Sequence, residues 1–433
     1  MSSNKKEKVF VGMSGGVDSS VAAFLLREQG YDVTGVFING FNVDGCQDKD
    51  AEDARRAADH LGIPFYALDA REDYFEHVVQ YMIEGYRKGL TPNPDVICNK
   101  EIKFGIFLEK ALKLGADYIA TGHYVRLLSP NVSAQSVSGA TPKSYSSQKH
   151  LATDFDMVSV ANYRLLTAKD TNKDQSYFLW TLTQEQLKHC LFPIGEYTKA
   201  EVREIARRVG LPNAEKKDSQ GVCFLGKVKL PDFLKEYIEP KKGDVLDVDG
   251  KKIGEHEGVQ FYTIGQRHLN VNFQFPTHLP DGQVSNFQIN SKSENSKHRD
   301  RMPCYIVSKD AGTNTLVVAE GDDHPALFKH EVELTNIHFI NPDLLKINNL
   351  TRLPDGQELK ILCRVRYRQP LVEATLVFDK NQYQSASEKS ASIRVIFENP
   401  QKFIAPGQSA VFYSENADEN GNREMLGGGV ILE

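Results

Sequence analysis

The sequence predicts an α/β doubly wound parallel sheet in an N-terminal domain, followed by a small bridging module and a C-terminal all-β barrel. Three observations support this fold class. Strand-like apolar runs alternate with amphipathic helical patterns between residues 9 and 124. A Gly- and Ser-rich loop directly follows the first run. From Cys304 onward the pattern changes to short alternating runs separated by turn residues, which is typical of a barrel.

The composition is that of an ordinary globular protein. The chain has 433 residues, 40% hydrophobic and 25% charged, enough for two or three domains. No apolar run reaches the roughly 18 residues of a membrane helix, so we expect no membrane association. Residues 1–8 lack the apolar segment of a signal peptide, and the six cysteines form no disulfide framework, so we expect a cytoplasmic location. The formal net charge of −6 means that nucleic acid would need a local basic patch.

The segment 9–20 (VFVGMSGGVDSS) predicts a buried strand, a tight loop and a helix N-terminus. Its glycines allow backbone N–H groups to approach a ligand, and the helix start adds partial positive charge, so the expected ligand is a phosphate. Ser14, Ser19 and Ser20 add neutral donors. A Walker A loop would end in Gly-Lys-Ser/Thr, and no lysine stands here. The sequence therefore predicts a different phosphate-binding loop.

The next segments continue the alternation. Strands are expected at 31–38, 65–68 and 118–121, and helices at 48–61, 75–86 and 104–112. In such a sheet the ligand lies at the carboxyl ends of the strands, where the opening loop ends the first strand and Gly122-His123 follows the fourth. His123 is therefore expected near the nucleotide, although a lone histidine is more often structural.

The remaining elements complete three predicted domains: 1–212, 213–272 and 300–433. In the first, residues 129–160 are a Ser-rich insertion, and helices are expected at 175–187 and 198–209, the latter with a Thr198/Glu201 capping box. The second is made of short Gly-punctuated segments. A polar stretch, 281–301, is read as a linker or an extended loop, and 380–392 as a further insertion. The strands expected for the barrel are 305–307, 316–319, 332–340, 359–367, 372–378, 393–397, 409–413 and 430–432.

Two cysteines lie in contexts that suit chemistry. Cys98 follows Asp95 by three residues just before a helix, where a thiol is biased toward the thiolate and the acid could exchange protons. Cys223 lies in a Gly-flanked loop, 217–226. Taken singly, a buried structural cysteine explains either one equally well. The other cysteines are read as structural, and no Cys or His spacing fits zinc or an iron–sulfur cluster.

Basic residues form two groups. Arg364, Arg366 and Arg368 alternate on one predicted strand, so they would share a face that grips phosphates or is simply solvated. A second cluster consists of Arg203, Arg207, Arg208, Lys216 and Lys217.

Several stretches, in order along almost the whole chain, resemble the tRNA-specific 2-thiouridylases, a family within the PP-loop ATP pyrophosphatases. The loop at 14–20 alone would indicate only the superfamily. The chain departs from the family pattern at 268–271, where HLNV follows GQR in place of a Lys-Gly-Leu-Gly-like run. The resembling stretches are TPNPDVICNKEIKFG (91–105), GADYIATGHYVRL (115–127), NKDQSYFLW (172–180), DSQGVCFLG (218–226), GEHEGVQFYTIGQR (254–267), RVRYRQP (364–370) and APGQSAVFY (405–413).

The resemblance implies an enzyme that uses ATP and Mg²⁺ to adenylate the C2 oxygen of the wobble uridine 34 in tRNAs for Lys, Glu and Gln, and then replaces that oxygen with sulfur. Asp18 would hold Mg²⁺ through ATP. The implied ATP-binding residues are Gly12, Met13, Ser14, Gly15, Gly16, Val17, Asp18, Ser19, Ile38 and Gly122.

The same resemblance implies roles for the two cysteines. Cys223 would carry a persulfide delivered by a sulfur-relay protein or cysteine desulfurase, Cys98 would resolve it through a disulfide with Cys223, and Asp95 would be the general acid/base. A monomer is expected. The implied tRNA contacts are Asn93, Pro94 and Asp95 at the target base, and His123, Lys173, Asp174, Gln175, Arg366, Tyr367 and Gln408 elsewhere.

Two other functions are compatible with parts of the sequence. Another PP-loop tRNA-modifying enzyme, such as a 2-thiocytidine synthetase, would be expected to carry Cys-x-x-Cys pairs, and an amidotransferase-type synthetase a glutaminase domain; the sequence has neither. An RNA-binding protein with an inactive nucleotide site would not need Ser14, Asp18, Asp95, Cys98 and Cys223 together.

Overall fold

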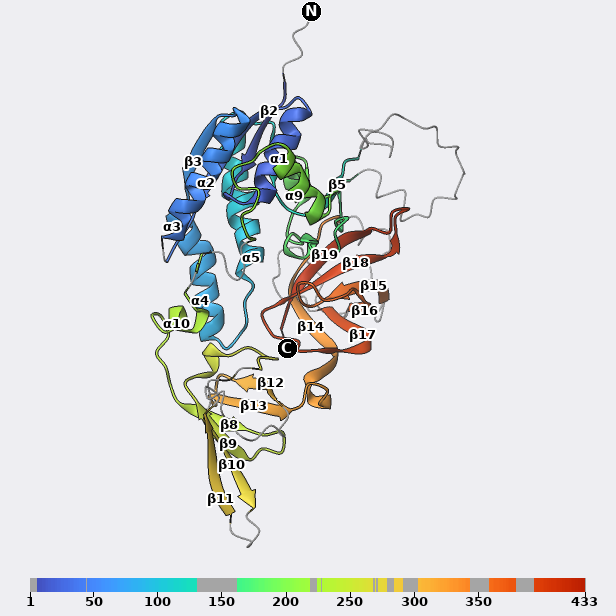
Figure 1. Ribbon diagram of the computed structural model, residues 1–433. Helices are drawn as coiled ribbons and strands as arrows, with labels where there is room; N and C mark the ends of the chain where they lie inside the picture. Colours follow the sequence, from blue (N-terminus) through green and yellow to red (C-terminus); the bar gives the residue numbers. More distant parts are fainter. Residues whose placement is uncertain are drawn as a thin grey trace, which may run out of the picture.

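The computed structural model of the protein (Figure 1) describes residues 6–43, 45–130, 162–218, 224–226, 228–267, 269, 272–278, 284–290, 303–342, 358–378 and 393–432. Cys223, residues 131–160 of the first insertion and the insertion at 380–392 lie outside these residues. Among the described helices, none is long and apolar enough to cross a membrane.

The N-terminal domain is built on five parallel strands in the order β3-β2-β1-β4-β7. Helices α1 (Val17–Glu28), α2 (Cys46–Leu61) and α9 (Lys199–Arg208) share a hydrophobic core on one face of the sheet. The helix around Phe104 packs in a separate core with Ile119. The doubly wound sheet is thus confirmed. The strands are β1 (Lys8–Gly12), β2 (Asp32–Asn39), β3 (Phe65–Asp69), β4 (Tyr118–Thr121) and β7 (Cys190–Leu191).

Two helices of this domain contain π-helical segments that the sequence pattern did not reveal. The first runs through α3 (Arg71–Tyr74), η1 (Phe75–Val79) and α4 (Gln80–Arg87), and the second through α5 (Pro94–Ile97), η2 (Cys98–Phe107) and α6 (Leu108–Lys113). Asn93 caps the second helix, since its Oδ1 accepts from the Val96 N–H at 3.4 Å. Because π-helical segments occur frequently at functional sites, the position of Cys98 at the start of one is notable.

The single helix expected over 175–187 is wrong. The structure has a 3₁₀ turn, η3 (Ser176–Phe178), and a short helix, α8 (Gln184–Leu187), which begins only where Thr183 forms a capping box with Gln186. Between these two elements, the apolar side chains pack against the barrel, where the Trp180 indole N–H donates to Ser409 Oγ at 3.1 Å. The one capping box predicted from the sequence, Thr198 with Glu201 at the start of α9, is confirmed.

The middle sheet has six strands in the order β11-β10-β9-β8-β13-β12. The polar stretch expected as a linker contains β11, which pairs with β10 over seven residues. The runs at 305–307 and 316–319 belong here and not to the barrel, because β13 pairs with β8. Helix α10 (Leu230–Leu234) and the 3₁₀ turn η4 (Val259–Phe261) adjoin the sheet. Its strands are β8 (Gly243–Leu246), β9 (Lys252–His256), β10 (Asn272–His278), β11 (Val284–Asn290), β12 (Cys304–Asp310) and β13 (Thr315–Glu320).

Six antiparallel strands close the C-terminal barrel through the pairing of β14 with β19, and the 3₁₀ turn η5 (Pro325–Leu327) leads into it. The N-terminal domain contributes to this sheet, since β5 (Arg126–Leu128) and β6 (Arg164–Leu166) extend it beyond β19. The barrel strands are β14 (Phe328–Phe339), β15 (Glu358–Arg364), β16 (Val372–Phe378), β17 (Ile393–Lys402), β18 (Ser409–Ala417) and β19 (Arg423–Ile431).

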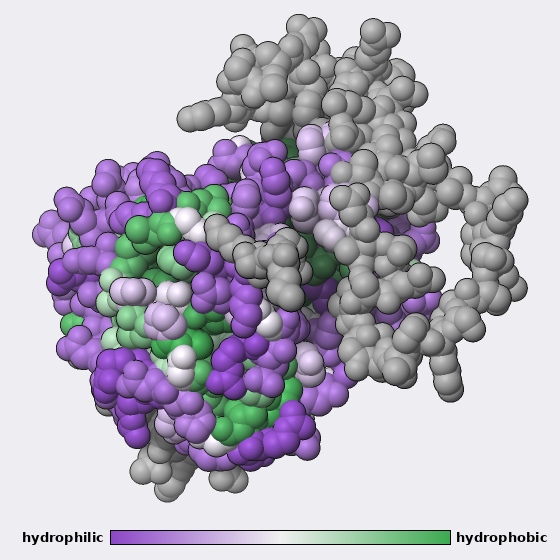
Figure 2. All heavy atoms as spheres, turned by 90° about the horizontal axis from the view of Figure 1, so that it is seen from above, coloured by the Kyte–Doolittle hydropathy of each residue, from purple (hydrophilic) through white to green (hydrophobic). Residues whose placement is uncertain are grey.

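The three sheets lie in different parts of an elongated molecule. In Figure 1 the N-terminal domain is at the top, the barrel is at the right, and the middle sheet is at the bottom. Seen from above (Figure 2), the surface is mostly hydrophilic, with a hydrophobic area at the left. Residues that bridge the domains, described below, therefore determine the geometry of any site between them.

Candidate active site

The strand order reverses at β1, and the loop 13–16 leaves the sheet at this point. Gly12 at the end of β1 lies opposite Thr121 at the end of β4, so the loop and Gly122 are neighbours. Gly15 has φ +74°, and a Cβ there would lie 2.2 Å from the Asp50 carbonyl oxygen. A Cβ on Gly122 would lie 2.6 Å from the Ser19 nitrogen. Both positions therefore require glycine, and the crevice is where ligands bind in open α/β sheets.

The loop is held in shape by its own hydroxyls and by a distant asparagine. Ser20 Oγ donates to the Gly16 carbonyl at 3.0 Å, and Asn213 Nδ2 donates to the Gly15 carbonyl at 2.9 Å. Ser14 is exposed at the loop tip. Because the residue before α1 is Gly16, it has no side chain that could cap the first-turn N–H groups. This arrangement fits a phosphate group, which the N-terminus of a helix binds readily.

A group of ionised side chains, here called the charge cluster, lies beside the loop. It consists of Asp18, Lys173, Lys199, Arg203 and Asp218. Lys199 Nζ lies 2.7 Å from Asp18 Oδ1 and 2.8 Å from Asp218 Oδ1. Lys173 and Arg203 also contact Asp218, at 2.6 and 2.9 Å. Burial alone would raise the pKa of Asp218, but Lys173 and Lys199 lower it to about 2. Asp218 is therefore ionised at neutral pH.

Asp95 and Cys98 form a second, buried group on the α5–η2 helix, here called the thiol site. Burial raises the pKa of Cys98, which is also hydrogen-bonded to the Tyr74 side chain. Burial likewise raises the pKa of Asp95, while Lys103 opposes this shift. The expected thiolate bias at a helix N-terminus is thus wrong: Cys98 lies beyond the first turn, where the helix dipole has faded, and it is shielded from water.

Cys223 lies outside the described residues, but Phe224, which follows it, is among them. The fully buried Phe224 has its ring centroid 5.7 Å from that of Tyr74. Phe41 and Phe233 also pack on the Phe224 ring, with ring centroids 6.1 and 5.9 Å from it. Tyr74 therefore touches both Cys98 and the neighbour of Cys223.

The turn before Asn93, in the N-terminal domain, is held by residues of the other two domains. The Thr91 N–H donates to the Pro406 carbonyl at 2.7 Å, and Gln408 Nε2 donates to the Thr91 carbonyl at 2.8 Å, both from the barrel side. From the middle sheet, Lys309 Nζ reaches Thr91 Oγ1 at 3.5 Å and the Tyr262 carbonyl at 2.7 Å. Burial lowers the pKa of Lys309 to about 8. Gln408, expected to contact tRNA, thus also fixes the approach to Asn93, Pro94 and Asp95.

The sequence Lys173-Asp174-Gln175 also makes internal contacts. Asp174 is 2% exposed, and its carboxylate accepts a hydrogen bond at 3.0 Å from Arg364. Arg364 is buried as well. Gln175 Oε1 accepts from the Tyr124 N–H at 2.9 Å. His123 is buried as well, with its Nδ1 2.8 Å from Thr121 Oγ1, and burial lowers its pKa well below the usual value, so the imidazole is neutral.

The expectation that three arginines share one strand face is wrong. Strand β15 ends at Arg364, which points into the interior and pairs with Asp174. Arg366 is partly buried over the Phe403 ring, and Arg368 lies in a turn with φ +65°. Of the three, only Arg368 is exposed. Tyr367, after the strand end, packs on Phe178 with ring centroids 4.5 Å apart and the rings tilted by 48°.

Four functional candidates were missed by sequence reasoning. Lys103 follows Cys98 by five residues, and in a π-helix the backbone pairs residue i with i+5, so the lysine charge acts on both Asp95 and Cys98. An α-helical pattern gives no such signal. Tyr74, Lys199 and Lys309 lie far from their partners in the chain, and no local pattern marks them.

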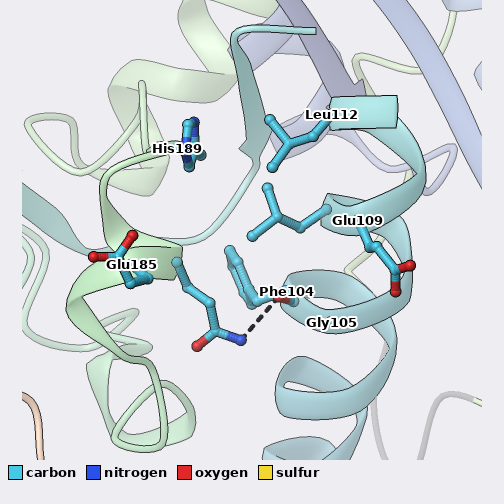
Figure 3. Close-up of a pocket in the computed structure, with 8 residues that line it drawn as sticks. Phe104, Gly105, Glu109, Leu112, Glu185 and His189 are labelled. Carbon is cyan, nitrogen blue, oxygen red and sulfur yellow. Dashed lines mark hydrogen bonds between the residues drawn. The ribbon is translucent and has the colours of Figure 1, made fainter. Parts of the chain in front are cut away.

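A separate apolar hollow lies between the η2–α6 helix and α8 (Figure 3). The groups around it already have partners: Gln186 Nε2 donates to the Phe104 carbonyl at 2.9 Å, and His189 Nδ1 lies 3.0 Å from the Asp117 carbonyl. It contains no residue of the charge cluster or of the thiol site. Its lining is Phe104, Gly105, Leu108, Glu109, Leu112, Glu185, Gln186 and His189.

Comparison with known proteins covers nearly the whole chain. Residues 7–227 match the family model described as tRNA methyl transferase HUP domain, residues 231–278 the tRNA methyl transferase PRC-barrel domain, and residues 335–431 the aminomethyltransferase beta-barrel domain. These descriptions mention methyl transfer, whereas the full-length relatives have a different name.

The relatives in question are bacterial proteins named tRNA-specific 2-thiouridylase MnmA. That of Flavobacterium johnsoniae is 37% identical over 468 residues, covering 98% of this chain and all of the relative. That of Streptococcus thermophilus is 38% identical over 439 residues, covering 100% and 96%. A Geobacillus kaustophilus relative, named MnmA 1, is 40% identical over 434 residues, covering 99% and 96%.

Proposed function

This chain belongs to the family of tRNA-specific 2-thiouridylases, ATP-using enzymes that convert a tRNA uridine to 2-thiouridine, and on that premise we propose how its residues divide the reaction. The observation that carries the proposal is the placement of Tyr74, which binds Cys98 on one side and packs on Phe224, next to Cys223, on the other. A residue that contacts both Cys98 and the neighbour of Cys223 suits a reaction in which sulfur passes from one cysteine and the other closes a disulfide.

The first step activates the base. ATP lies along the loop 13–16, with its adenosine between Ile38 and Gly122 and its phosphates at the first-turn N–H groups of α1. Asp18 would hold Mg²⁺ with the phosphates, and the ion would supply positive charge there. The C2 oxygen of the uridine attacks the α-phosphate, pyrophosphate leaves, and the oxygen becomes part of a good leaving group. The other residues assigned to ATP are Gly12, Met13, Ser14, Gly15, Gly16, Val17 and Ser19.

The second step replaces oxygen with sulfur. The terminal sulfur of a persulfide on Cys223 attacks C2, the C–O bond breaks, and AMP leaves. The Cys98 thiolate then attacks the Cys223 sulfur, so the S–S bond to the base breaks, 2-thiouridine is released and a Cys98–Cys223 disulfide forms. A thiol reductant restores both cysteines. Asp95 acts as general acid/base, for which its raised pKa is suited.

The substrate is the wobble uridine 34 of tRNAs for Lys, Glu and Gln. Flipped out of the anticodon loop, it meets Asn93, Pro94 and Asp95, whose turn is braced by Gln408 and Lys309. The barrel of the last domain adds contacts to tRNA. Further contacts assigned to tRNA are His123, Lys173, Asp174, Gln175, Arg366 and Tyr367, of which Asp174 is buried in an ion pair with Arg364.

The proposal includes partners and organisation. Residues 1–212 form the ATP-binding catalytic unit, and the module at 213–272 carries the Cys223 loop. The persulfide comes from a sulfur-relay protein or a cysteine desulfurase. The enzyme works as a monomer in the cytoplasm, where tRNA, ATP and reduced thiols are all present.

Nucleoside mass spectrometry tests the function directly. A tRNA(Glu) transcript is incubated with the protein, ATP, Mg²⁺ and a persulfide donor, and 2-thiouridine is quantified. We expect product with the wild type and its loss in Cys223→Ser and Asp18→Ala. Cys304→Ser is the matched control, because that thiol lies on β12 outside the thiol site. Undiminished product in Cys223→Ser would overturn the persulfide mechanism while leaving thiolation itself intact.

A further inference from the structure

We propose that Lys199 supplies the ATP phosphates with the positive charge that the loop 13–16 lacks. The idea rests on the ATP activation step proposed above and assigns a further residue to it. In a Walker A loop the lysine comes from the loop itself. Here the loop offers backbone N–H groups and serine hydroxyls, all neutral, and the cation that contacts Asp18 belongs to helix α9, 181 residues further along the chain.

The backbone around Lys199 is fixed so that its side chain reaches the loop. Thr198 caps α9, and the Lys199 N–H donates to Asp170 Oδ2 at 2.9 Å. From there Lys199 Nζ contacts both carboxylate oxygens of Asp18, at 2.7 and 2.8 Å. Asp18 is in the first turn of α1, directly after the loop. The ammonium is therefore held beside the N–H groups that face the phosphates.

The two carboxylates around Lys199 take the place of an anion. Asp18 and Asp218 both contact its ammonium, and the side chain is only 13% exposed. If Asp18 bound Mg²⁺, Lys199 would lose one of its two carboxylates. A phosphate oxygen could then replace that carboxylate, so that no charge in the site would be left without a partner.

The other cations of the charge cluster are less suited to this role. Arg203 donates to the Ala214 and Lys216 carbonyls at 3.2 and 3.1 Å, so it holds the segment before Asp218. Lys173 contacts Asp218 at 2.6 Å, and in the part of the chain that the structure describes it makes no hydrogen bond or ion pair with Asp18. Of these three, Lys199 is the cation that binds Asp18 directly.

The test is ligand binding, independent of thiolation. Isothermal titration gives the Kd of Lys199→Met, Lys199→Arg and the wild type for Mg-ATP and for adenosine, which lacks phosphates. We expect Lys199→Met to bind Mg-ATP about 10- to 100-fold more weakly, with adenosine affinity within about 2-fold of the wild type. Lys199→Arg should recover part of the affinity, because it keeps the charge.

Lys169→Met is the matched control. It removes an equal charge near the start of α9, but Lys169 pairs with Glu201 and not with Asp18. Unchanged Mg-ATP affinity in Lys199→Met, or equal weakening for adenosine, would overturn the proposal and leave a structural ion pair. So would a wild type that does not bind Mg-ATP. The proposed function fails separately: tRNA would stay unthiolated even at ATP concentrations that saturate the wild type.

Discussion

The charge cluster and the thiol site differ in how they hold charge, although the proposed reaction uses both. In the charge cluster, Asp18 and Asp218 are paired with lysines and remain partly accessible to water. In the thiol site, burial raises the pKa of both Asp95 and Cys98, so the protein favours their neutral forms. In the proposed reaction, a lysine of the charge cluster exchanges a carboxylate for a phosphate oxygen when ATP binds. The thiol site instead keeps Cys98 as the less reactive thiol until the sulfur-carrying cysteine reacts with the base.

The largest expected effect comes from the thiol site. Cys98→Ser should lower the rate of multiple-turnover tRNA thiolation by about 10³-fold or more, because serine cannot resolve the persulfide. The Kd for Mg-ATP should not change, since Cys98 has no contact with the loop. Cys190→Ser is the control, as it removes an equally buried thiol that donates to the Gln186 carbonyl. A normal turnover rate in Cys98→Ser would remove the thiol site from the mechanism.

The next largest effect concerns Asp95. Asp95→Asn should slow thiolation about 10²-fold, within the usual range for loss of a general acid or base. Because burial raises the pKa of Asp95, the wild-type rate should rise with pH through a value above the usual 3.9 or so, and the variant should lack this limb. Rates measured from pH 4.5 upward check both points.

Asp73→Asn, on an exposed pair with Lys110, is the control for the loss of charge. If Asp95→Asn keeps the wild-type pH profile, the titrating group lies elsewhere and Asp95 only shapes the turn.

A smaller effect is expected where the middle sheet supports the thiol site. Lys309→Met should raise the KM for tRNA about 10-fold, because the turn at Thr91 loses a support, while the Kd for Mg-ATP stays constant. A KM increase for tRNA alone separates this positioning role from general unfolding, which would lower binding of both substrates.

The same variant tests the pKa of Lys309, lowered by burial to about 8 from 10.5. Between these values the unfolded chain binds more protons than the folded one, so this group adds stability as pH rises. The wild type should gain up to about 3 kcal/mol over Lys309→Met between pH 8 and 10.5, and this gain is lost as pH falls through 8. Urea unfolding at both ends of that range checks the sign. A flat difference would mean that Lys309 is charged and hydrated.

Local patterns were sufficient for the parts of the fold that depend on local physics. The loop at 13–16 was predictable because Gly15 needs positive φ, and the capping box at Thr198 because its two hydrogen bonds join residues three apart. The prediction of a helix over 175–187 was wrong because the apolar Trp180 packs against the barrel, so its position does not mark one face of a helix. Strands β12 and β13 were recognised as strands, but alternation does not identify the partner of a strand.

The sites show the same limit. Asp95 and Cys98 could be selected from sequence because their neighbours in the chain signal chemistry, and Asp18 because of the resemblance to the family. Lys199 and Tyr74 could not, because their partners are brought near only by the fold. The protonation state of Cys98 was also out of reach, since it depends on burial by residues such as Tyr74 and not on the helix position alone.

The smallest expected effects concern the charge cluster, where one substitution should strengthen Mg-ATP binding and weaken the folded state. Asp218→Asn removes a carboxylate that competes with phosphate for Lys199, so Mg-ATP should bind a few-fold more tightly, as expected for about 1 kcal/mol or less of partly exposed ion pairing. The folded state should lose a similar amount of stability at neutral pH.

This loss has a defined pH dependence, because the pKa of Asp218 is lowered from 3.8 to about 2. The stability that the wild type gains from its carboxylate is present above pH 3.8 and disappears as pH falls through 2. Titration calorimetry and unfolding of Asp218→Asn can be compared with Glu215→Gln, whose exposed partner is Arg207. Weaker Mg-ATP binding in Asp218→Asn would mean that Asp218 orients Lys199 toward the loop instead of competing for it, so the two regions would differ in exposure but not in their readiness to exchange charge.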